Sequence, residues 1–231
     1  MSIQDDAREF QMVQLFNLAV AEERGRSDID AVLSYQGRQL PFELKSTTGR
    51  SISTVRDFGR GHIEKWRELH WLFGFYEPNG TRLRWCHYAS PHDMRPWIDG
   101  RAAYVGPDLV LAEHVPELIG LGTLHRILGE KRVYTLEDAQ SVHKQQYTAA
   151  RYREAMDLDE GYSPERMLAI VRDRCRYVLE RGLTLNNPKI PGSYFDGFER
   201  IEQNHAIRLR QLVTNWLQAQ DDPSQAADQG V

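Results

Sequence analysis

The chain has 231 residues, and its 29 Lys and Arg side chains against 33 Asp and Glu give a formal net charge of −4. A hydrophobic content of 41% is enough for a core and too high for a disordered chain. No apolar run approaches the roughly 20 residues that span a bilayer, and the first residues lack the apolar segment of a signal peptide. We therefore expect a soluble, cytoplasmic protein. Two cysteines exclude a disulfide framework.

The mild acidity argues against a protein that coats nucleic acid with a uniformly basic surface. It does not exclude DNA binding, because a nearly neutral body can line one groove with basic side chains and use carboxylates as metal ligands. The last residues, 221–231, carry three aspartates and no base, and this composition predicts a disordered tail.

The first half of the chain alternates helical and extended patterns. Apolar residues at helical spacing predict a helix over 6–24. A polar turn at Gln36-Gly37 joins two segments that read as a hairpin, with one strand over 27–33 and the other over 39–46. The expected elements that follow are a helix over 61–69, a buried central strand over 71–76 and its antiparallel partner over 82–88.

Prolines interrupt the helical pattern in the second half of the chain. Four prolines between residues 90 and 120, at 91, 96, 107 and 116, predict short helices and loops. Ser163-Pro164-Glu165 is a strong helix start, because it supplies an N-cap serine, a proline at N1 and an acid near the positive end of the helix dipole. A last helix is expected over 199–218.

The segment that indicates chemistry is the hairpin. Side chains alternate along a strand, so Glu43 and Lys45 share one face while Phe42 and Leu44 face the core. Asp28 and Asp30 share a face of the partner strand, and either one fits the spacing. A pairing of the two strands would bring an aspartate, a glutamate and a lysine together.

This set of groups suits phosphodiester hydrolysis. Two carboxylates hold a hard cation such as Mg²⁺ through oxygen ligands. The cation neutralises charge on the scissile phosphate and lowers the pKa of a bound water, and a lysine stabilises the transition state electrostatically. An acid-x-lysine triplet by itself is also common on exposed strands.

The chain resembles the PD-(D/E)xK nuclease superfamily, and within it type II restriction endonucleases of the PvuII kind. The match covers residues 27–76 and 186–194 in the same order. Its most specific part is the string Asn-Asn-Pro-Lys-Ile-Pro at 186–191. The other matching segments are Asp30-Ala31-Val32, Phe42-Glu43-Leu44-Lys45-Ser46, Ser53-Thr54, Lys65-Trp66-Arg67, residues 71–76 and Tyr194.

The resemblance implies an α/β fold with a restriction-endonuclease-like mixed central sheet flanked by helices. It implies a nuclease domain, which we expect over 1–220, with the catalytic hairpin at 27–46 and a recognition loop at 186–194. Residues at about 90–180 have no clear counterpart in the match, and we expect them to form a helical insert. It selects Asp30 over Asp28 as metal ligand, with Glu43 as the second ligand, Lys45 as the catalytic lysine and Mg²⁺ as cofactor. The residues expected to contact DNA are Ser53, Thr54, Asn186, Asn187 and Lys189.

The chain departs from the family pattern after Ser53-Thr54. A histidine cluster of the family is replaced by Val55-Arg56-Asp57-Phe58, so a different target sequence is expected. Arg56 either reads guanine through a bidentate fork or pairs with Asp57. A helix-borne carboxylate often joins such sites, and the candidates are Glu9, Glu22 and Glu23.

The expected function is that of a type II restriction endonuclease, which hydrolyses both strands of a specific duplex DNA sequence and leaves 5′-phosphate ends. The resemblance implies a homodimer, a cognate DNA methyltransferase as genetic partner and no membrane association. The alternatives are a structure-specific repair or junction-resolving nuclease, a non-catalytic DNA-binding module, and a soluble enzyme of another kind in which Asp30, Glu43 and Lys45 are surface charges.

Overall fold

The computed structural model describes residues 3–20, 29–54, 59–183 and 188–221. Its contacts divide the chain into two compact units, one formed by Met1–Ala102 with Asn187–Val231 and the other by Ala103–Asn186. The second unit covers most of the insert predicted at about 90–180. No helix among the described residues is long and apolar enough to cross a membrane.

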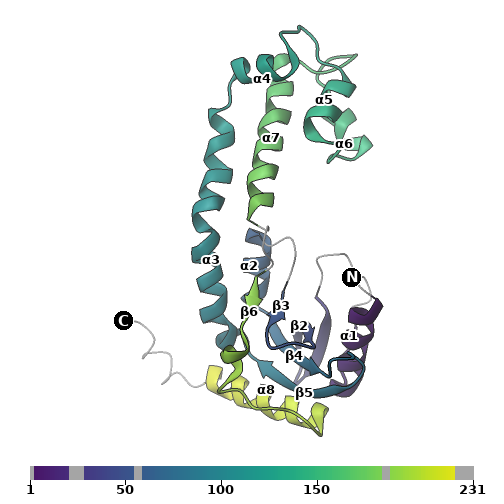
Figure 1. The fold of residues 1–231 in the computed structure, drawn as a ribbon, viewed down its shortest axis with the longest axis vertical. Coiled ribbons are helices and arrows are strands. Elements are labelled where there is room, and N and C mark those ends of the chain that lie inside the picture. Colours follow the sequence, from purple (N-terminus) through teal and green to yellow (C-terminus); the bar gives the residue numbers. More distant parts are fainter. Residues whose placement is uncertain (1–2, 21–28, 55–58, 184–187, 222–231) are drawn as a thin grey trace. The chain divides into compact units, whose positions relative to one another are not determined.

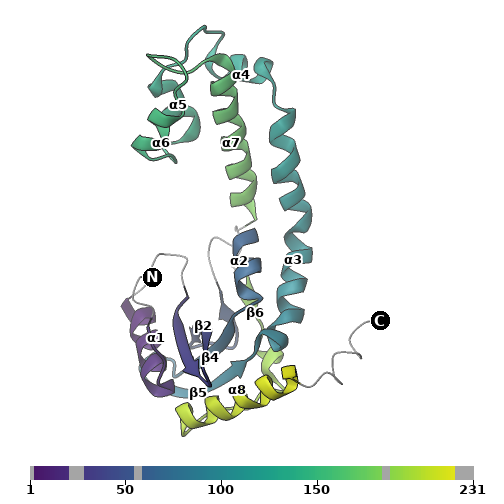
Figure 2. The same ribbon diagram turned by 180° about the vertical axis from the view of Figure 1, so that it is seen from behind.

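The first unit is an α/β unit built on a four-stranded sheet (Figures 1 and 2). Its elements are α1 (Ile3–Phe16), β1 (Ala31–Tyr35), β2 (Arg38–Thr47), β3 (Ile52–Ser53), α2 (Arg60–Trp66), β4 (His70–Tyr76), β5 (Leu83–Ala89), the start of α3 (Pro91–His114), β6 (Lys189–Ile190), the 3-10 helix η2 (Gly192–Phe195) and α8 (His205–Asp221).

The main sheet has the strand order β1-β2-β4-β5. β2 and β4 run parallel, whereas β1 pairs with β2 and β5 pairs with β4 in antiparallel fashion. The predicted mixed sheet flanked by helices is therefore confirmed. The hairpin turn has positive φ at both Gln36 and Gly37, which is the backbone that a two-residue type I′ turn requires.

One face of the sheet carries the larger apolar core. Phe42 and Leu44 are fully buried there, as the alternation along β2 predicts. Helices α1 and α8 cover this face, where they contribute Phe16 and Leu209 among other buried side chains.

The opposite face of the sheet is lined by aromatic side chains. Trp71 and Phe73 of β4 stack on each other, Trp66 of α2 and Trp97 of α3 pack edge-on against Trp71, and Phe195 of η2 packs against Phe73. Glu43 and Lys45 lie on this second face, since both alternate with the buried Phe42 and Leu44.

Several of the predicted boundaries were wrong, and the last helix, for example, begins at His205 and not at residue 199. The first helix ends at Phe16 because Asn17 adopts a left-handed φ of 51°, and Ala19 then exchanges two backbone hydrogen bonds with Val32. Residues 21–24 of the predicted helix lie outside the described residues. The first strand begins at Ala31, so Asp30 immediately precedes it.

The second unit is helical. Besides the end of α3 it contains η1 (Val115–Leu118), α4 (Leu121–Leu128), α5 (Leu136–His143), α6 (Ala149–Glu154) and α7 (Pro164–Gly182). α7 begins as predicted, and the Ser163 hydroxyl accepts a hydrogen bond from the Arg166 amide at 3.1 Å. The hydrophobic core of this helical unit includes Tyr134, Tyr162 and Met167.

The prediction of short helices after residue 90 was wrong for α3, which runs for 24 residues. Pro91 occupies the first position, where its missing amide costs nothing. Pro96 and Pro107 each remove one hydrogen bond from the helix. The burial of Met94, Ile98 and similar side chains along α3 offsets that cost, because tertiary packing overrides local propensity.

Candidate active site

Asp30, Glu43 and Lys45 meet at one point of the first unit. The Lys45 Nζ atom lies 2.6 Å from Glu43 Oε1 and 3.4 Å from Asp30 Oδ2. All three side chains are mostly buried, with exposed fractions of 20% for Asp30, 8% for Glu43 and 17% for Lys45. The structure thus brings together all three residues that the sequence predicts as catalytic.

Backbone contacts fix Asp30 and Lys45 in this arrangement. The Asp30 amide donates to the Phe42 carbonyl at 3.1 Å, and Asp30 Oδ2 accepts a hydrogen bond from the Leu44 amide at 2.8 Å. Lys45 Nζ also donates to the Leu44 carbonyl at 3.0 Å. The hairpin register therefore determines the positions of both side chains, because their partners belong to β2 itself.

A second cation adjoins the site and was missed by the sequence-based prediction. Lys65, near the end of α2, places Nζ 3.5 Å from Glu43 Oε2. That oxygen is buried and accepts no hydrogen bond from the described residues. The one available signal was the resemblance of Lys65-Trp66-Arg67 to a family helix, which gave no role to the lysine.

Burial and charge set the ionisation of the site. Burial raises the pKa of the Asp30 carboxyl above its ordinary range; nearby Lys45 opposes that effect and the Glu43 carboxylate adds to it. The pKa of Lys45 is raised too, because the Glu43 and Asp30 carboxylates outweigh the cost of burying the ammonium. Lys45 is therefore a cation at neutral pH.

The donor set suits a hard divalent cation. Asp30 and Glu43 offer carboxylate oxygens, the ligands that Mg²⁺ prefers, and Mg²⁺ usually keeps several waters beside one or two carboxylates. Glu43 Oε2 is buried and accepts no hydrogen bond from the described residues, so this oxygen, 3.5 Å from Lys65 Nζ, is a candidate ligand atom. Across the described ranges, no group of three or more His, Cys, Asp or Glu side chains is placed to hold a metal, so a cation here would have two protein carboxylates.

Several predicted site residues lie outside the described residues. They are Asp28, the helix acids Glu22 and Glu23, and the predicted DNA contacts Arg56, Asn186 and Asn187. The third helix acid, Glu9, is partly buried on α1. Its negative charge contributes to the raised pKa of Lys45, so Glu9 lies within electrostatic reach of the site.

The two segments predicted to contact DNA lie side by side. β3 and β6 form a separate two-stranded antiparallel sheet in which Ser53 pairs with Lys189. The Thr54 amide and hydroxyl both donate to the Pro188 carbonyl, at 3.0 and 2.9 Å. Ser53 and Lys189 are exposed. Residues more than 130 positions apart in the chain thus form one small surface.

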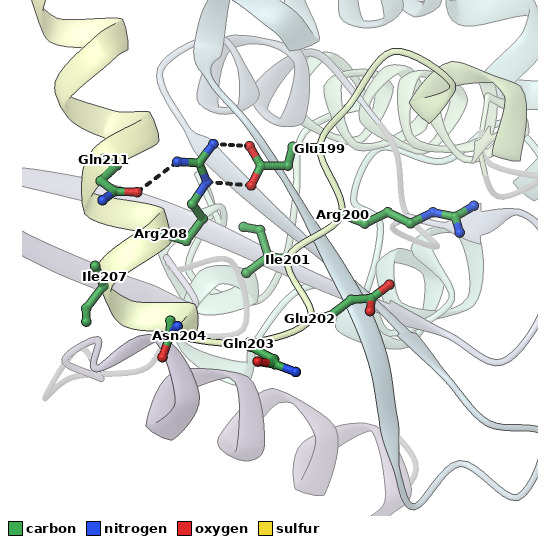
Figure 3. A pocket seen from close by; sticks show the side chains of 9 residues that line it. All are labelled: Glu199, Arg200, Ile201, Glu202, Gln203, Asn204, Ile207, Arg208 and Gln211. Carbon is green, nitrogen blue, oxygen red and sulfur yellow. Dashed lines mark hydrogen bonds and ion pairs between the residues drawn. The ribbon is translucent and has the colours of Figure 1, made fainter.

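A further hollow, of about 410 Å³, lies between the segment before α8 and α8 itself (Figure 3). Its main cation is already neutralised, because Arg208 forms a two-pronged ion pair with Glu199 and a hydrogen bond to Gln211. Figure 3 also shows the Arg200 side chain directed away from this pair. The Arg208 charge is therefore not available to a ligand in this hollow.

Comparison with known proteins adds no relative to this picture. No protein-family model matches the chain, and no curated protein matches it.

Proposed function

We propose that this protein is a Mg²⁺-dependent endonuclease that cleaves both strands of a specific duplex DNA sequence and leaves 5′-phosphate ends, in the manner of a type II restriction endonuclease. The observation that carries the proposal is the convergence of two carboxylates and one ammonium group, contributed by Asp30, Glu43 and Lys45, within 3.4 Å. The four-stranded mixed sheet flanked by helices is compatible with a restriction-endonuclease-like fold.

Lys45 acts as a cation and not as a base in this proposal. Its pKa is raised by the two carboxylates, so it keeps its proton at neutral pH. A fixed ammonium stabilises the negative charge that develops on a phosphate in the transition state and orients the attacking water by donating hydrogen bonds. Its hydrogen bond to the Leu44 carbonyl fixes the ammonium before the substrate arrives.

Asp30 and Glu43 would hold the metal ion. When bound, Mg²⁺ supplies charge neutralisation of the phosphate and a water of lowered pKa. The Leu44 amide holds Asp30 in place, and Lys65 lies beside the second oxygen of Glu43. The chain therefore orients both carboxylates through neighbours of its own, which limits their freedom before a metal ion is bound.

Sequence recognition is assigned to the small surface formed by β3 and β6. Ser53, Thr54 and Lys189 belong to it, and the proposal adds Arg56, Asn186 and Asn187 from the neighbouring sequence. Asparagine pairs bidentately with adenine, and lysine or arginine donates to guanine. A homodimer with one active site per strand and a methyltransferase that protects host DNA complete the proposal.

The test is digestion of a mapped plasmid with Mg²⁺ or with EDTA, followed by sequencing of the ends. We expect discrete fragments that require Mg²⁺. Lys45→Ala should reduce cleavage by about 10²- to 10³-fold, as expected for removal of an electrostatic transition-state contact, and should retain DNA binding. Lys131→Ala is the matched control, because Lys131 pairs with Asp138 in the helical unit.

Three outcomes would overturn the proposal in different ways. Cleavage only at branched or damaged DNA would indicate a repair or junction-resolving nuclease. Tight binding of one sequence without cleavage would indicate a DNA-binding module. Unchanged activity of the Lys45→Ala protein would show that the site lies elsewhere.

A further inference from the structure

A hollow of about 770 Å³ in the first unit has an aromatic floor and a basic rim. It is bounded by the residues that follow β2, by β4 and β5 and by the η2 segment. Phe75 and Phe195 contribute to the buried part, and Trp85 of β5 stacks on Phe75 with ring centroids 5.3 Å apart. Arginines 50, 84 and 200 line the same hollow.

Two of the three arginines are held against the indole of Trp85. The guanidinium carbon lies 4.4 Å from the ring centroid for Arg84 and 4.6 Å for Arg200. Arginine that stacks on an aromatic ring keeps its planar set of N–H donors available for a phosphate or a carboxylate. The stacking therefore restrains two cations without consuming their hydrogen-bonding capacity.

No acid among the described residues neutralises these cations. Within the described residues, Arg50, Arg84 and Arg200 form no ion pair, whereas Arg208 close by is paired with Glu199. Among the described residues that line the hollow, Asp196 is the one acid. The indole N–H of Trp85 is also buried without a hydrogen-bond acceptor in that part of the chain. An excess of unpaired donors of this kind favours an anionic ligand.

The hollow lies on the same face of the sheet as the candidate active site. Thr47, two residues beyond Lys45, pairs with Phe75, and Phe75 pairs with Trp85. Paired residues point to the same face of a sheet. Two strand spacings and two residues along a strand separate the Cα atoms of Lys45 and Trp85 by about 12 Å. Measured along the helix axis of duplex DNA, that distance corresponds to roughly three or four base pairs.

We propose that the hollow rimmed by Arg84 and Arg200 on Trp85 binds the phosphodiester backbone of the DNA substrate, a few nucleotides from the phosphate that is cleaved. This inference rests on the proposed nuclease function and adds a backbone-binding site to it. The site carries no sequence information of its own, because it contacts phosphates and not base edges. Its role is to hold the duplex in position relative to Lys45.

The test measures the salt dependence of DNA binding by fluorescence anisotropy, with a labelled duplex that contains the mapped target, in EDTA so that no cleavage occurs. Each phosphate contact that is lost should reduce the slope of log affinity against log salt by about 1. The Arg84→Gln/Arg200→Gln protein should therefore lose about 2 from the slope and bind target and unrelated duplexes more weakly by the same factor. Its thermal unfolding midpoint reports on folding.

Arg82→Gln is the matched control. Arg82 lies on the same hairpin, is 80% exposed and pairs with Glu77, so its loss should leave the slope unchanged. An unchanged slope in the double variant, or an equal loss in Arg82→Gln, would overturn the backbone-binding site and leave the nuclease proposal intact. Loss of slope in a protein that never cleaves would support the site and reject the nuclease. Absence of DNA binding by the wild-type protein would reject both.

Discussion

Lys65 Nζ lies 3.5 Å from Glu43 Oε2, and the two residues belong to different elements, α2 and β2. Glu43 thus lies between two ammonium groups, since Lys45 contacts its other oxygen at 2.6 Å. A carboxylate held from both sides keeps one orientation, which is what a metal ligand requires. Lys65 is therefore a positioning residue for the candidate active site.

Removal of the Lys65 charge should weaken catalysis without abolishing it. Residues that orient metal ligands typically contribute 10- to 100-fold, so Lys65→Met should reduce the rate of plasmid cleavage by about that factor. Glu64→Gln, on the exposed side of the same helix, is the control and should cleave normally. A Lys65→Met protein that cleaves at the wild-type rate at limiting Mg²⁺ would show that Lys65 does not position Glu43.

Asp30→Asn should separate activity from stability. Burial raises the pKa of Asp30, so the folded protein binds this proton more tightly than the unfolded chain does. The group therefore adds stability in acid, and that contribution is lost as the pH rises through its raised pKa. Asparagine removes the buried charge and can still accept from the Leu44 amide.

We expect Asp30→Asn to abolish cleavage and to raise the unfolding midpoint at pH 7.5, with a smaller gain at pH 4. Calorimetry at the two pH values measures this difference. A midpoint that falls at pH 7.5 would show that the contacts of Asp30 with Lys45 outweigh the cost of burying its charge.

His70 should make the fold sensitive to acid. It is buried at 1% exposure, its Nδ1 lies 2.8 Å from the Tyr88 hydroxyl, and burial lowers its pKa to about 4 from an ordinary value of 6.5. The folded protein then binds fewer protons than the unfolded chain, so stability falls as the pH drops below 6.5. By pH 4.5 the loss from this group is about 2–3 kcal/mol.

His70→Gln should therefore reduce the difference in unfolding free energy between pH 7 and pH 4.5 by about 2–3 kcal/mol, measured by urea denaturation. His92→Gln, at an exposed position, should leave the difference unchanged. Some acid sensitivity remains in both, because burial also lowers the pKa of His87. If the stability of His70→Gln depended on pH as that of the wild-type protein does, His70 would not be the source of the acid sensitivity.

Gly192, the first residue of η2, lies close to the backbone of the residues before β3. A Cβ atom at this position would collide with the Arg50 backbone carbonyl, whereas at Gly197 it would meet nothing within 4 Å. Because backbone cannot move aside as a side chain does, Gly192→Ala should cost about 1–3 kcal/mol and displace η2 from the residues before β3. Cleavage of the target should weaken in Gly192→Ala and not in Gly197→Ala. Equal activity of the two proteins would show that the close contact between Gly192 and the Arg50 backbone is not needed for cleavage.

The sequence was sufficient for the local part of the site. The alternation of Phe42, Glu43, Leu44 and Lys45 and the turn at Gln36-Gly37 define a hairpin whose geometry depends on neighbours in the chain. The selection of Asp30 came from the resemblance, and the structure places that aspartate beside Lys45.

Contacts between residues far apart in the chain could not be predicted from the sequence in the same way. Lys65 reaches Glu43 because α2 packs beside the sheet, and no local pattern encodes that contact. The pairing of Ser53 with Lys189 joins segments whose common role came from the resemblance. α3 was missed because Pro96 and Pro107 are local signals against a helix, and the packing that compensates for them is tertiary.

The strict alternation along β2 ties correct folding to catalytic competence. A slip of one residue in the pairing of β1 with β2 would turn Glu43 and Lys45 inward and expel Phe42 and Leu44 to the other side. Such a misaligned chain would lose its hydrophobic interior and would separate Asp30 from Glu43 and Lys45 at the same time. Under the proposed function, a chain folded in the wrong register would therefore be unable to cleave DNA.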